Sequence, residues 1–322
     1  MKTKKTFPWL TVVPFMILAA IIIIMGFVAG WGTMYAGNNI EALFNQAFNW
    51  MVAGLGMVFV TTIGSTDITH GALLCLAGGL GCYAGQAWGV WAMVPVALLV
   101  GIASGALLGI LNTKFKANTF MMSLALMLAY KGLNGSLFLN KRAVCPEGIK
   151  FIDNVWFKII FLIILFLVVL FVYNYTPFGT YLKGIGENET AMKHVGFNVS
   201  KVKFAAFVIS GLLCALASVF NSARLGGFDN KAGVSFEMNV MMVMFIGGIP
   251  VSGGMKSQLY KIIIGAFTII ILQNGLKVAN IEAGYVQLIM GIVLLLSVGF
   301  TLFLSRRLSR LNEKAAVNQK NA

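Results

Sequence analysis

Charged side chains are scarce in this sequence of 322 residues. Asp, Glu, Lys and Arg together make up 11% of the positions, while apolar and aromatic residues (A, V, I, L, M, F, W, Y and C) make up 59%. Soluble domains average about a quarter charged and about half apolar residues. The shortage of charge therefore excludes an ordinary soluble domain and indicates a polytopic membrane protein.

Acidic residues are the scarcer of the two charge signs. The sequence has 10 Asp and Glu against 24 Lys and Arg, which gives a formal net charge of +14. A basic nucleic-acid-binding domain concentrates its Lys and Arg on one water-exposed face. Here the basic residues stand between apolar runs, a pattern that reports membrane topology. We therefore expect no nucleic-acid partner.

Histidine and cysteine are also rare, with two and four copies. Cys75, Cys82 and Cys214 lie inside apolar runs and Cys145 in a polar loop. No CxxC pair is present, so we interpret all four as small buried side chains. The sequence has no Ser, His and Asp set, no metal-ligand cluster and no carboxylate pair. We expect no metal, no cofactor and no catalytic activity in this chain.

A nucleotide-binding site is missing too. The glycine-containing stretch 248–257 partly matches a phosphate-binding loop, but Lys256 follows Met255 where that loop requires Gly, and no strand precedes it. No other nucleotide site is visible in the sequence. Any ATP chemistry is therefore expected on a separate polypeptide.

Long charge-free intervals predict an all-α membrane protein. A bilayer core about 30 Å thick requires roughly 20 residues of apolar helix, and division of the intervals at charges and glycines predicts about ten transmembrane helices. Their approximate spans are 9–29, 48–63, 70–88, 92–113, 118–138, 156–175, 204–222, 238–250, 259–276 and 283–304. The eighth and ninth are short for a crossing, and a broken or re-entrant segment explains them equally well.

The basic residues predict the orientation of these helices. When both termini are placed in the cytoplasm, 16 Lys and Arg fall on the cytoplasmic side and 8 on the exterior side, which accounts for all 24. We therefore expect residues 1–8 to form a cytoplasmic tail, residues 9–304 the transmembrane domain and residues 305–322 a polar cytoplasmic tail.

Glycines recur every four residues in two neighbouring spans. Gly101, Gly105 and Gly109 form one such row, and Gly81 and Gly85 repeat the spacing in the preceding helix. Rows of small residues allow helix backbones to approach closely. We favour packing within one chain over a seam between two chains.

The longest cytoplasmic loop, residues 177–203, contains the signals of a short helix. These are an N-cap, an acidic first turn, a basic last turn and a C-terminal glycine, supplied by Asn188, Glu189, Lys193 with His194, and Gly196. Spacing alone leaves two interpretations open. The helix docks on a soluble partner, or it lies on lipid headgroups.

A second polar break lies between the second and third predicted spans and contains Asp67 and His70. Ionisable groups inside a bilayer are costly and normally face the bundle interior or a watery cavity. Broken helices at membrane depth mark substrate pathways in many transporters. We favour the simpler alternative, a cytoplasmic turn in which Asp67 caps the third helix.

Several stretches, in order, resemble the permease subunits of ribose-type ABC importers. The elements are GSTDITHG at 64–71, the loop FGTYLKGIGENETA at 178–191 with GFNVSKVK at 196–203, ARL at 223–225, GG at 247–248 with SGG at 252–254, and NGL at 274–276. The resemblance covers roughly residues 48–304. This chain departs from the family pattern at Thr180 (usually Arg), Glu187 (usually Gly) and His70 (usually apolar).

The resemblance implies a function and partners. A member of that family is a permease of the bacterial cytoplasmic membrane that imports a small polar solute. It works with a second permease subunit as a homodimer, a cytoplasmic ATPase and an extracytoplasmic binding protein.

The resemblance favours a sugar as solute, and the alternatives are nucleosides and branched-chain amino acids. It also implies that the loop contains the coupling helix that contacts the ATPase, with Glu187, Asn188, Glu189, Thr190, Ala191, Met192, Lys193, His194 and Gly196. We take Asp67, Thr69, His70 and Asn274 as candidates for the translocation path.

Two functions of other classes stay open. An ion-coupled secondary transporter would use Asp67 and His70 as its coupling site, and a membrane scaffold or channel would need no solute-binding partner. Lys131 stands where the family tends to have Arg. We favour a side chain that reaches the exterior interface over one that pairs internally.

Overall fold

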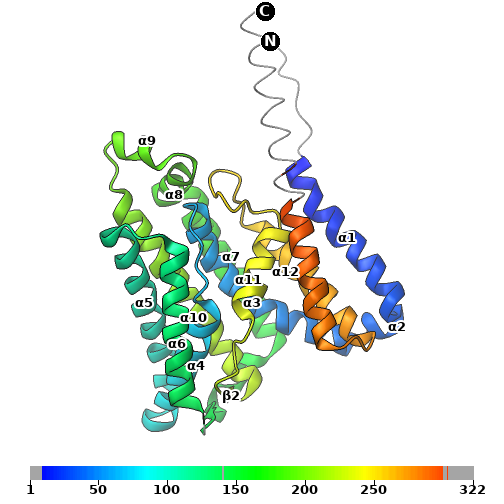
Figure 1. The fold of residues 1–322 in the computed structure, drawn as a ribbon. Helices are drawn as coiled ribbons and strands as arrows, with labels where there is room; N and C mark the ends of the chain where they lie inside the picture. The colour runs from blue at the N-terminus through cyan, green and yellow to red at the C-terminus, as the bar shows by residue number, and fades with distance from the viewer. Residues whose placement is uncertain (1–8, 140, 300–302, 304–322) are drawn as a thin grey trace, which may run out of the picture.

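The computed structural model describes residues 9–139, 141–299 and 303, and the fold is a bundle of α-helices (Figure 1). The predicted tails 1–8 and 305–322 lie outside the described residues. The helices are α1 Trp9–Ala29, α2 Trp31–Met34, α3 Gly37–Thr62, α4 His70–Trp88, α5 Val90–Phe115, α6 Thr119–Phe138, α7 Val155–Tyr175, α8 Pro177–Glu187, α9 Glu189–His194, α10 Val199–Leu225, α11 Phe236–Ile246 and α12 Tyr260–Val278. A further apolar helix covers Ala283–Gly299.

The only regular structure of another kind in this part of the chain is small. A 3-10 helix, η1, covers Glu147–Asp153, and the two-residue strands β1 (Ala143–Val144) and β2 (Gly227–Phe228) pair antiparallel. Figure 1 places β2 at one end of the bundle and α8 with α9 at the other.

Six helices are long and apolar enough to cross a membrane: α1, α3, α5, α7, α10 and α12. This confirms an all-α, multi-pass membrane protein. Each of the ten predicted segments contains a helix, and α4 has the predicted bounds. The eighth, α11, is only 11 residues long, whereas the ninth, α12, has 19 and is not short for a crossing. Ten full crossings stay a prediction.

The helix α3 begins eleven residues before the predicted start at residue 48. Polar residues before residue 48, among them Glu41 and Asn45, led us to place the boundary too late, whereas Asn49 already lies in the predicted span. In the fold both asparagines have partners: Asn45 accepts a hydrogen bond from Lys158 at 2.7 Å, and Asn49 donates to Asn221 at 3.2 Å. A helix retains such residues when neighbouring helices satisfy them.

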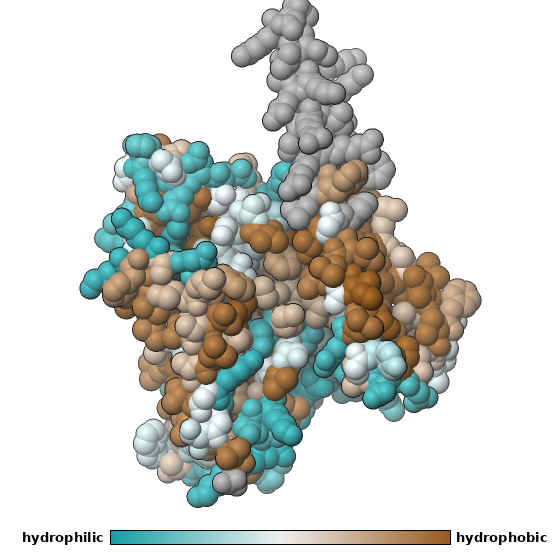
Figure 2. All heavy atoms as spheres, viewed as in Figure 1, coloured by the Kyte–Doolittle hydropathy of each residue, from teal (hydrophilic) through white to brown (hydrophobic). Residues whose placement is uncertain are grey.

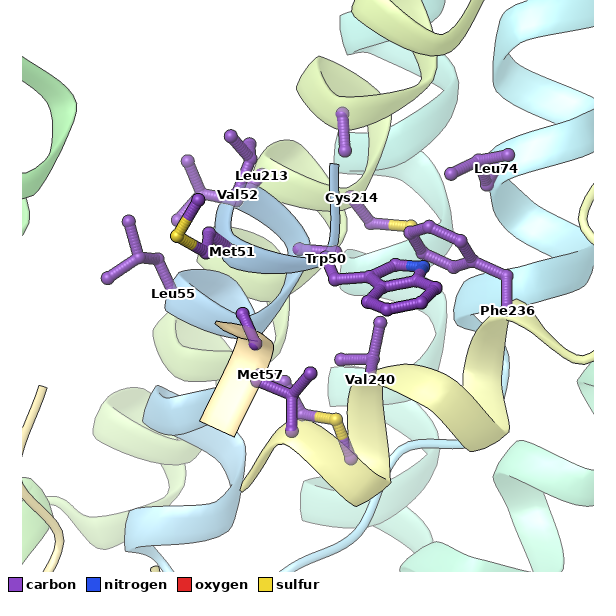
Figure 3. Close-up of a cluster of buried hydrophobic side chains, with 14 of the residues drawn as sticks. Trp50, Met51, Val52, Leu55, Met57, Leu74, Leu213, Cys214, Phe236 and Val240 are labelled. Atoms are coloured by element: carbon purple, nitrogen blue, oxygen red, sulfur yellow. The ribbon is translucent and has the colours of Figure 1, made fainter. Parts of the chain in front are cut away.

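The core of the bundle forms around α3. In its most apolar stretch 83% of the residues are buried, against 17% in α1 and 11% in α7, so α1 and α7 lie at the periphery. Trp50, near the middle of α3, packs beside Phe236 and Val240 of α11 (Figure 3).

The glycine rows pack within the chain, as predicted. A Cβ atom at Gly101 or Gly105 of α5 would overlap the backbone carbonyls of Gly211 or Phe207 in α10, and one at Gly81 of α4 would lie 2.9 Å from the carbonyl oxygen of Met93. These close approaches require the absence of a side chain. They hold α4, α5 and α10 together as one unit.

Two helices begin inside the bundle. The segment 64–69 after α3 has no regular structure, and α4 starts at His70, whose ring lies beside Ser210 near the middle of α10. The helix α11 starts at Phe236, at the level of Trp50 (Figure 3). The helical chain is therefore interrupted twice inside the bundle. The first break is the segment 64–69 before α4, and the second break is the segment 229–235 before α11.

Candidate functional site

The end of the bundle that carries α8 and α9 is the first candidate site. The predicted capping of α9 is present: the side-chain oxygen of Asn188 accepts from the backbone N–H of Ala191 at 2.9 Å, and Gly196 has φ of 88° at the helix end. The sequence analysis missed α8. Its signal was Pro177, which stands at the first position of the helix, where proline is favoured.

The surface of α9 is free. None of its residues is buried, and Thr190, Ala191 and His194 are exposed, while Met192 is half-buried against α8. The following Val195 is a 70% exposed apolar side chain. A short helix with an unpacked outer face has the shape of a contact surface for another molecule.

Glu189 forms ion pairs with two lysines, one within α9 and one on α10, and the second holds α9 on the bundle. One carboxylate oxygen lies 2.6 Å from Lys193, one turn further along α9, and the other lies 2.6 Å from Lys203 of α10. Burial acts to raise the pKa of Glu189, but the hydrogen bonds from Lys193 and Lys203 outweigh it and hold the pKa below its ordinary value. The carboxylate thus stays ionised and joins α9 to α10.

Glu187, a departure from the family pattern, has its partner inside the chain. Its carboxylate accepts a hydrogen bond from the backbone N–H of Met255 at 2.9 Å. This contact joins the end of α8 to the loop 247–259, which contains the second glycine motif.

The same end of α8 is wedged against the end of α3. A Cβ atom at Gly186 would overlap the carbonyl oxygen of Thr62, and that oxygen also accepts from the N–H of Gly254 at 2.9 Å. The end of α7 is joined to the same loop, because the hydroxyl group of Tyr173 donates to the carbonyl oxygen of Ser257 at 2.9 Å. The end of α8 therefore packs directly against the residues that precede the break 64–69.

A polar cavity of ≈ 610 Å³ lies beside this break. The helix ends that enclose it belong to α5, α6, α9 and α10, and its charged lining residues are Lys116, Glu189, Lys193 and Lys203. Gly64, Ser65 and Thr66 form another wall. The cavity therefore joins the first break to the base of α9.

The break itself carries Asp67, Thr69 and His70 as one buried cluster. One Asp67 oxygen accepts from the backbone N–H of Thr69 at 2.9 Å and from its hydroxyl at 2.7 Å. The other lies 3.7 Å from Nδ1 of His70, whose Nε2 is 3.2 Å from the hydroxyl of Ser210. Asp67 is only 4% exposed and His70 fully buried.

This geometry corrects one interpretation. Asp67 is not the N-cap of α4: that residue is Thr69, which makes no side-chain capping hydrogen bond, and Asp67 instead accepts from the N–H and the hydroxyl of Thr69. A simple turn at the cytoplasmic surface is wrong, because the residues are buried and His70 packs against Ser210 in the middle of α10. The broken-helix alternative describes the segment better.

Asn274 does not join that cluster. Its side-chain amide donates to the side-chain oxygen of Asn39 at 2.8 Å and so links α12 to the start of α3. Asn39 in turn donates to the carbonyl oxygen of Met34 at 2.7 Å. The side chain of Asn274 is occupied by a contact between helices.

Lys131 corrects another interpretation. Its ammonium nitrogen lies 3.4 Å from Oε1 of Glu237 at the start of α11, so the side chain pairs internally. The sequence analysis missed Glu237. The available signal was a lone acid directly before the predicted span 238–250, whose helix starts two residues earlier, at Phe236.

Metal ligands and disulfides contribute nothing to these sites. Across residues 9–139, 141–299 and 303, no group of three His, Cys, Asp or Glu side chains is placed to hold a metal ion. All four cysteines are free and buried, as their sequence context predicted.

Comparison with known proteins gives one family. Residues 39–298 match the family model described as "Branched-chain amino acid transport system / permease component". The chain is 30% identical to the ribose import permease protein of Bacillus subtilis (81% of this chain, 83% of the relative) and 27% identical to that of Haemophilus influenzae (82% and 85%). It is 27% identical to the xylose transport system permease protein of H. influenzae (88% and 94%). No solved structure matches the chain.

Proposed function

Because this chain belongs to the permease family described as branched-chain amino acid transport system / permease component, we propose that it is the membrane-spanning subunit of an ABC importer for a sugar. The observation that carries the proposal is the arrangement of α8 and α9: an exposed helix whose base is packed against the end of α3 and the break that follows it. ATP hydrolysis takes place on a separate subunit.

A sugar is the proposed solute because relatives that align over more than four fifths of the chain are named as ribose or xylose permeases. The family description names branched-chain amino acids. The fold contains no feature that favours those, or nucleosides, over a sugar. The three solutes are therefore separated by measurement on the cognate binding protein.

The proposed ATPase contact is the surface formed by residues 187–196. Asn188 and Gly196 set the two ends of α9, and Glu189 holds it to α10. Thr190, Ala191 and His194 provide its exposed face, with Lys193 beside them. Met192 and Glu187 face the rest of the coupling platform, which consists of α8, α9, the loop 247–259 and the end of α3. Through this platform, closure of the ATPase dimer would be passed to α8 and from there to α3.

Ten crossings with both termini in the cytoplasm are the proposed topology. In that orientation the α8 and α9 end is cytoplasmic, in a bacterial inner membrane, and the β1 and β2 end is exterior. The helices α4 and α11 complete their crossings together with the irregular segments 64–69 and 229–235. Non-helical backbone at membrane depth is tolerated where protein buries it, and Asp67 shows that burial at 4% exposure.

The working assembly is a homodimer of this chain with two ATPase subunits and an exterior binding protein. The binding protein delivers the sugar to the exterior side of the two permeases, and ATP-driven movement of α9 changes which side is open. We propose that Asp67, Thr69 and His70 form the pivot of the first break on that path. Asn274 would contribute by holding α12 to α3.

Reconstitution tests this function. The chain is co-expressed with the ATPase and binding protein encoded beside it, purified, and placed in proteoliposomes with ATP enclosed. We expect sugar uptake that requires ATP, the ATPase and the binding protein, and a raised melting temperature of the binding protein with its sugar.

Two results would contradict the proposal. Uptake that follows an ion gradient and persists without the ATPase would show a secondary transporter. A chain that never retains an ATPase in detergent and conducts without a binding protein would show a channel or scaffold.

A further inference from the structure

The ion pair between Lys131 of α6 and Glu237 of α11 is charged, exposed and deep in the bundle. Lys131 has 45% of its side chain exposed, whereas Glu237 has 9%. Among the ion pairs of the described residues, this one joins α6 to the start of α11, the helix that follows the second break. Nothing in the coupling platform uses it.

The depth of the pair follows from its neighbours. Asn134, one turn after Lys131 on α6, donates to the carbonyl oxygen of Ala72 in the first turn of α4 at 2.9 Å. That turn begins at His70, which contacts Ser210 near the middle of the 27-residue helix α10. The pair therefore lies in the central part of the bundle, far from either end.

A half-exposed ammonium group at this depth does not face lipid. Charged side chains within membrane segments are costly against hydrocarbon and face the bundle interior or water. Figure 2 is viewed from the side where α6 and α11 lie. It shows hydrophilic and intermediate residues that interrupt the apolar surface between the helices α4, α5, α6 and α10 on one side and α1, α11 and α12 on the other. The exposed side of the pair therefore faces water or a second protein chain.

The pair also has unused hydrogen-bonding capacity. At 3.4 Å the contact occupies one of the three donors of the Lys131 ammonium. Glu237 uses Oε1 for this contact, while its Oε2 is buried without a partner against Gly71. A side chain at Gly71 would overlap that carboxylate, so the start of α4 fixes where Glu237 can lie.

We propose that Lys131 and Glu237 form the solute-contacting site on a water-lined surface between α6 and α11, and this rests on the proposed function. A hydroxyl group of a sugar accepts from a free N–H of the Lys131 ammonium and donates to Oε1 of Glu237, while Oε2 stays against Gly71. Because the two charges compensate each other, the site takes an uncharged polyol. Gly71 acts as a positioning residue for Glu237.

Thiol accessibility tests the surface without any transport measurement. Lys131→Cys and Leu133→Cys are made in the full chain and treated in native membranes with a charged, water-soluble methanethiosulfonate. Leu133 is also exposed (50%) but points about 200° away around α6. We expect at least tenfold faster modification of Lys131→Cys, with the four native cysteines buried and silent. Equal or slower modification would overturn the water-lined surface.

Glu237→Gln tests the contact with the solute, because it keeps the shape of the side chain and removes its charge. In proteoliposomes we expect at least tenfold less sugar taken up per ATP hydrolysed, with stimulation of the ATPase by the binding protein unchanged within about twofold. The matched control is Glu147→Gln, which removes the exposed ion pair with Lys150 in η1 and should change neither value.

Wild-type uptake by Glu237→Gln would overturn the solute contact. If the wild-type chain itself shows no ATP-driven uptake, the proposed function fails, while the thiol comparison still decides whether the surface faces water. The two failures are therefore distinguishable.

Discussion

The hydroxyl group of Tyr173 lies 2.8 Å from the hydroxyl of Thr62, and this contact fixes the end of α7 against the end of α3. The same hydroxyl donates to the carbonyl oxygen of Ser257. The ring is 1% exposed, so both contacts are made away from water. The hydroxyl group of Tyr173 thus links the end of α7 to the end of α3 and to the loop 247–259, next to the break that carries Asp67.

Tyr173→Phe should therefore weaken the platform. A buried acceptor left without its donor costs about 1–3 kcal/mol, and the carbonyl of Ser257 and the hydroxyl of Thr62 both lose a partner. We expect a lower melting temperature in detergent together with less uptake per ATP. Tyr35→Phe is the control, because Tyr35 donates to Ile22 at the start of the chain. A normal ratio of uptake to ATP in Tyr173→Phe would refute the coupling role of this contact.

Substitutions of Asp67 distinguish a structural role of its hydrogen bonds to Thr69 from a role in ion coupling. Asp67→Asn keeps an oxygen that accepts from Thr69, whereas Asp67→Ala removes it, and a buried donor left without its acceptor costs about 1–3 kcal/mol. We expect near-normal ATP-driven uptake and expression for Asp67→Asn, and reduced levels of folded protein for Asp67→Ala. Uptake is measured at several external pH values for each variant. Abolished uptake in well-folded Asp67→Asn would favour a direct role in ion or proton transfer.

The pKa of Glu189 predicts how the base of α9 responds to acid. Its folded-state pKa is depressed, so the carboxylate contributes stability above its unfolded pKa, near 4.3, and loses it as the pH falls through the lower folded value. Because Glu189 is 37% exposed, solvent screens the pair and the contribution is at most about 1 kcal/mol. Hydrogen exchange of the α9 amides should be unchanged between pH 7 and 5 and should rise only in stronger acid.

Lys203→Met is the matching variant for this link. It removes the ammonium on α10 and leaves the Lys193 pair intact, so α9 amides should exchange faster at neutral pH. Lys201→Met, an exposed neighbour, is the control. If exchange in α9 is the same in both variants, Glu189 does not hold the helix to α10.

The backbone at Gly196 gives a test of the α9 boundary. Gly196 has φ of 88° and no atom within 4 Å of an added Cβ, so any effect of Gly196→Ala comes from backbone strain, about 1–2 kcal/mol. We expect impaired ATPase binding with normal membrane insertion. Gly284→Ala is matched, because it is equally uncrowded and its φ is not in the left-handed region. ATPase retention after affinity purification is the measurement. Equal retention in the two variants would show that α9 does not depend on this turn.

Much of the fold could be predicted because lipid imposes strong rules on a sequence. Each of the ten predicted runs contains a helix, and the Asn188 cap located the start of α9 to the residue. The failures share a physical cause. Asn45 lies inside α3, before the predicted start of that helix, and Lys131 pairs with Glu237 instead of reaching the interface, because partners distant in sequence satisfy both side chains. A single sequence does not show which residues will meet across the bundle, so Glu237 and the depth of His70 were not predictable.

Two glycines of α8 provide the sharpest test of how that helix is seated. A Cβ at Gly186 would overlap the carbonyl oxygen of Thr62, which is backbone and cannot move aside, whereas a Cβ at Gly184 would meet the sulfur of Met192 at 2.8 Å, the end of a flexible side chain. Gly186→Ala should therefore displace α8 and reduce uptake per ATP at least tenfold, while Gly184→Ala should stay within about twofold of wild type. Both are scored in proteoliposomes against the melting temperature of the complex. If the two variants behave alike, contact between α8 and α3 does not transmit the work of the ATPase, and the signal must reach the membrane through α9 and α10 alone.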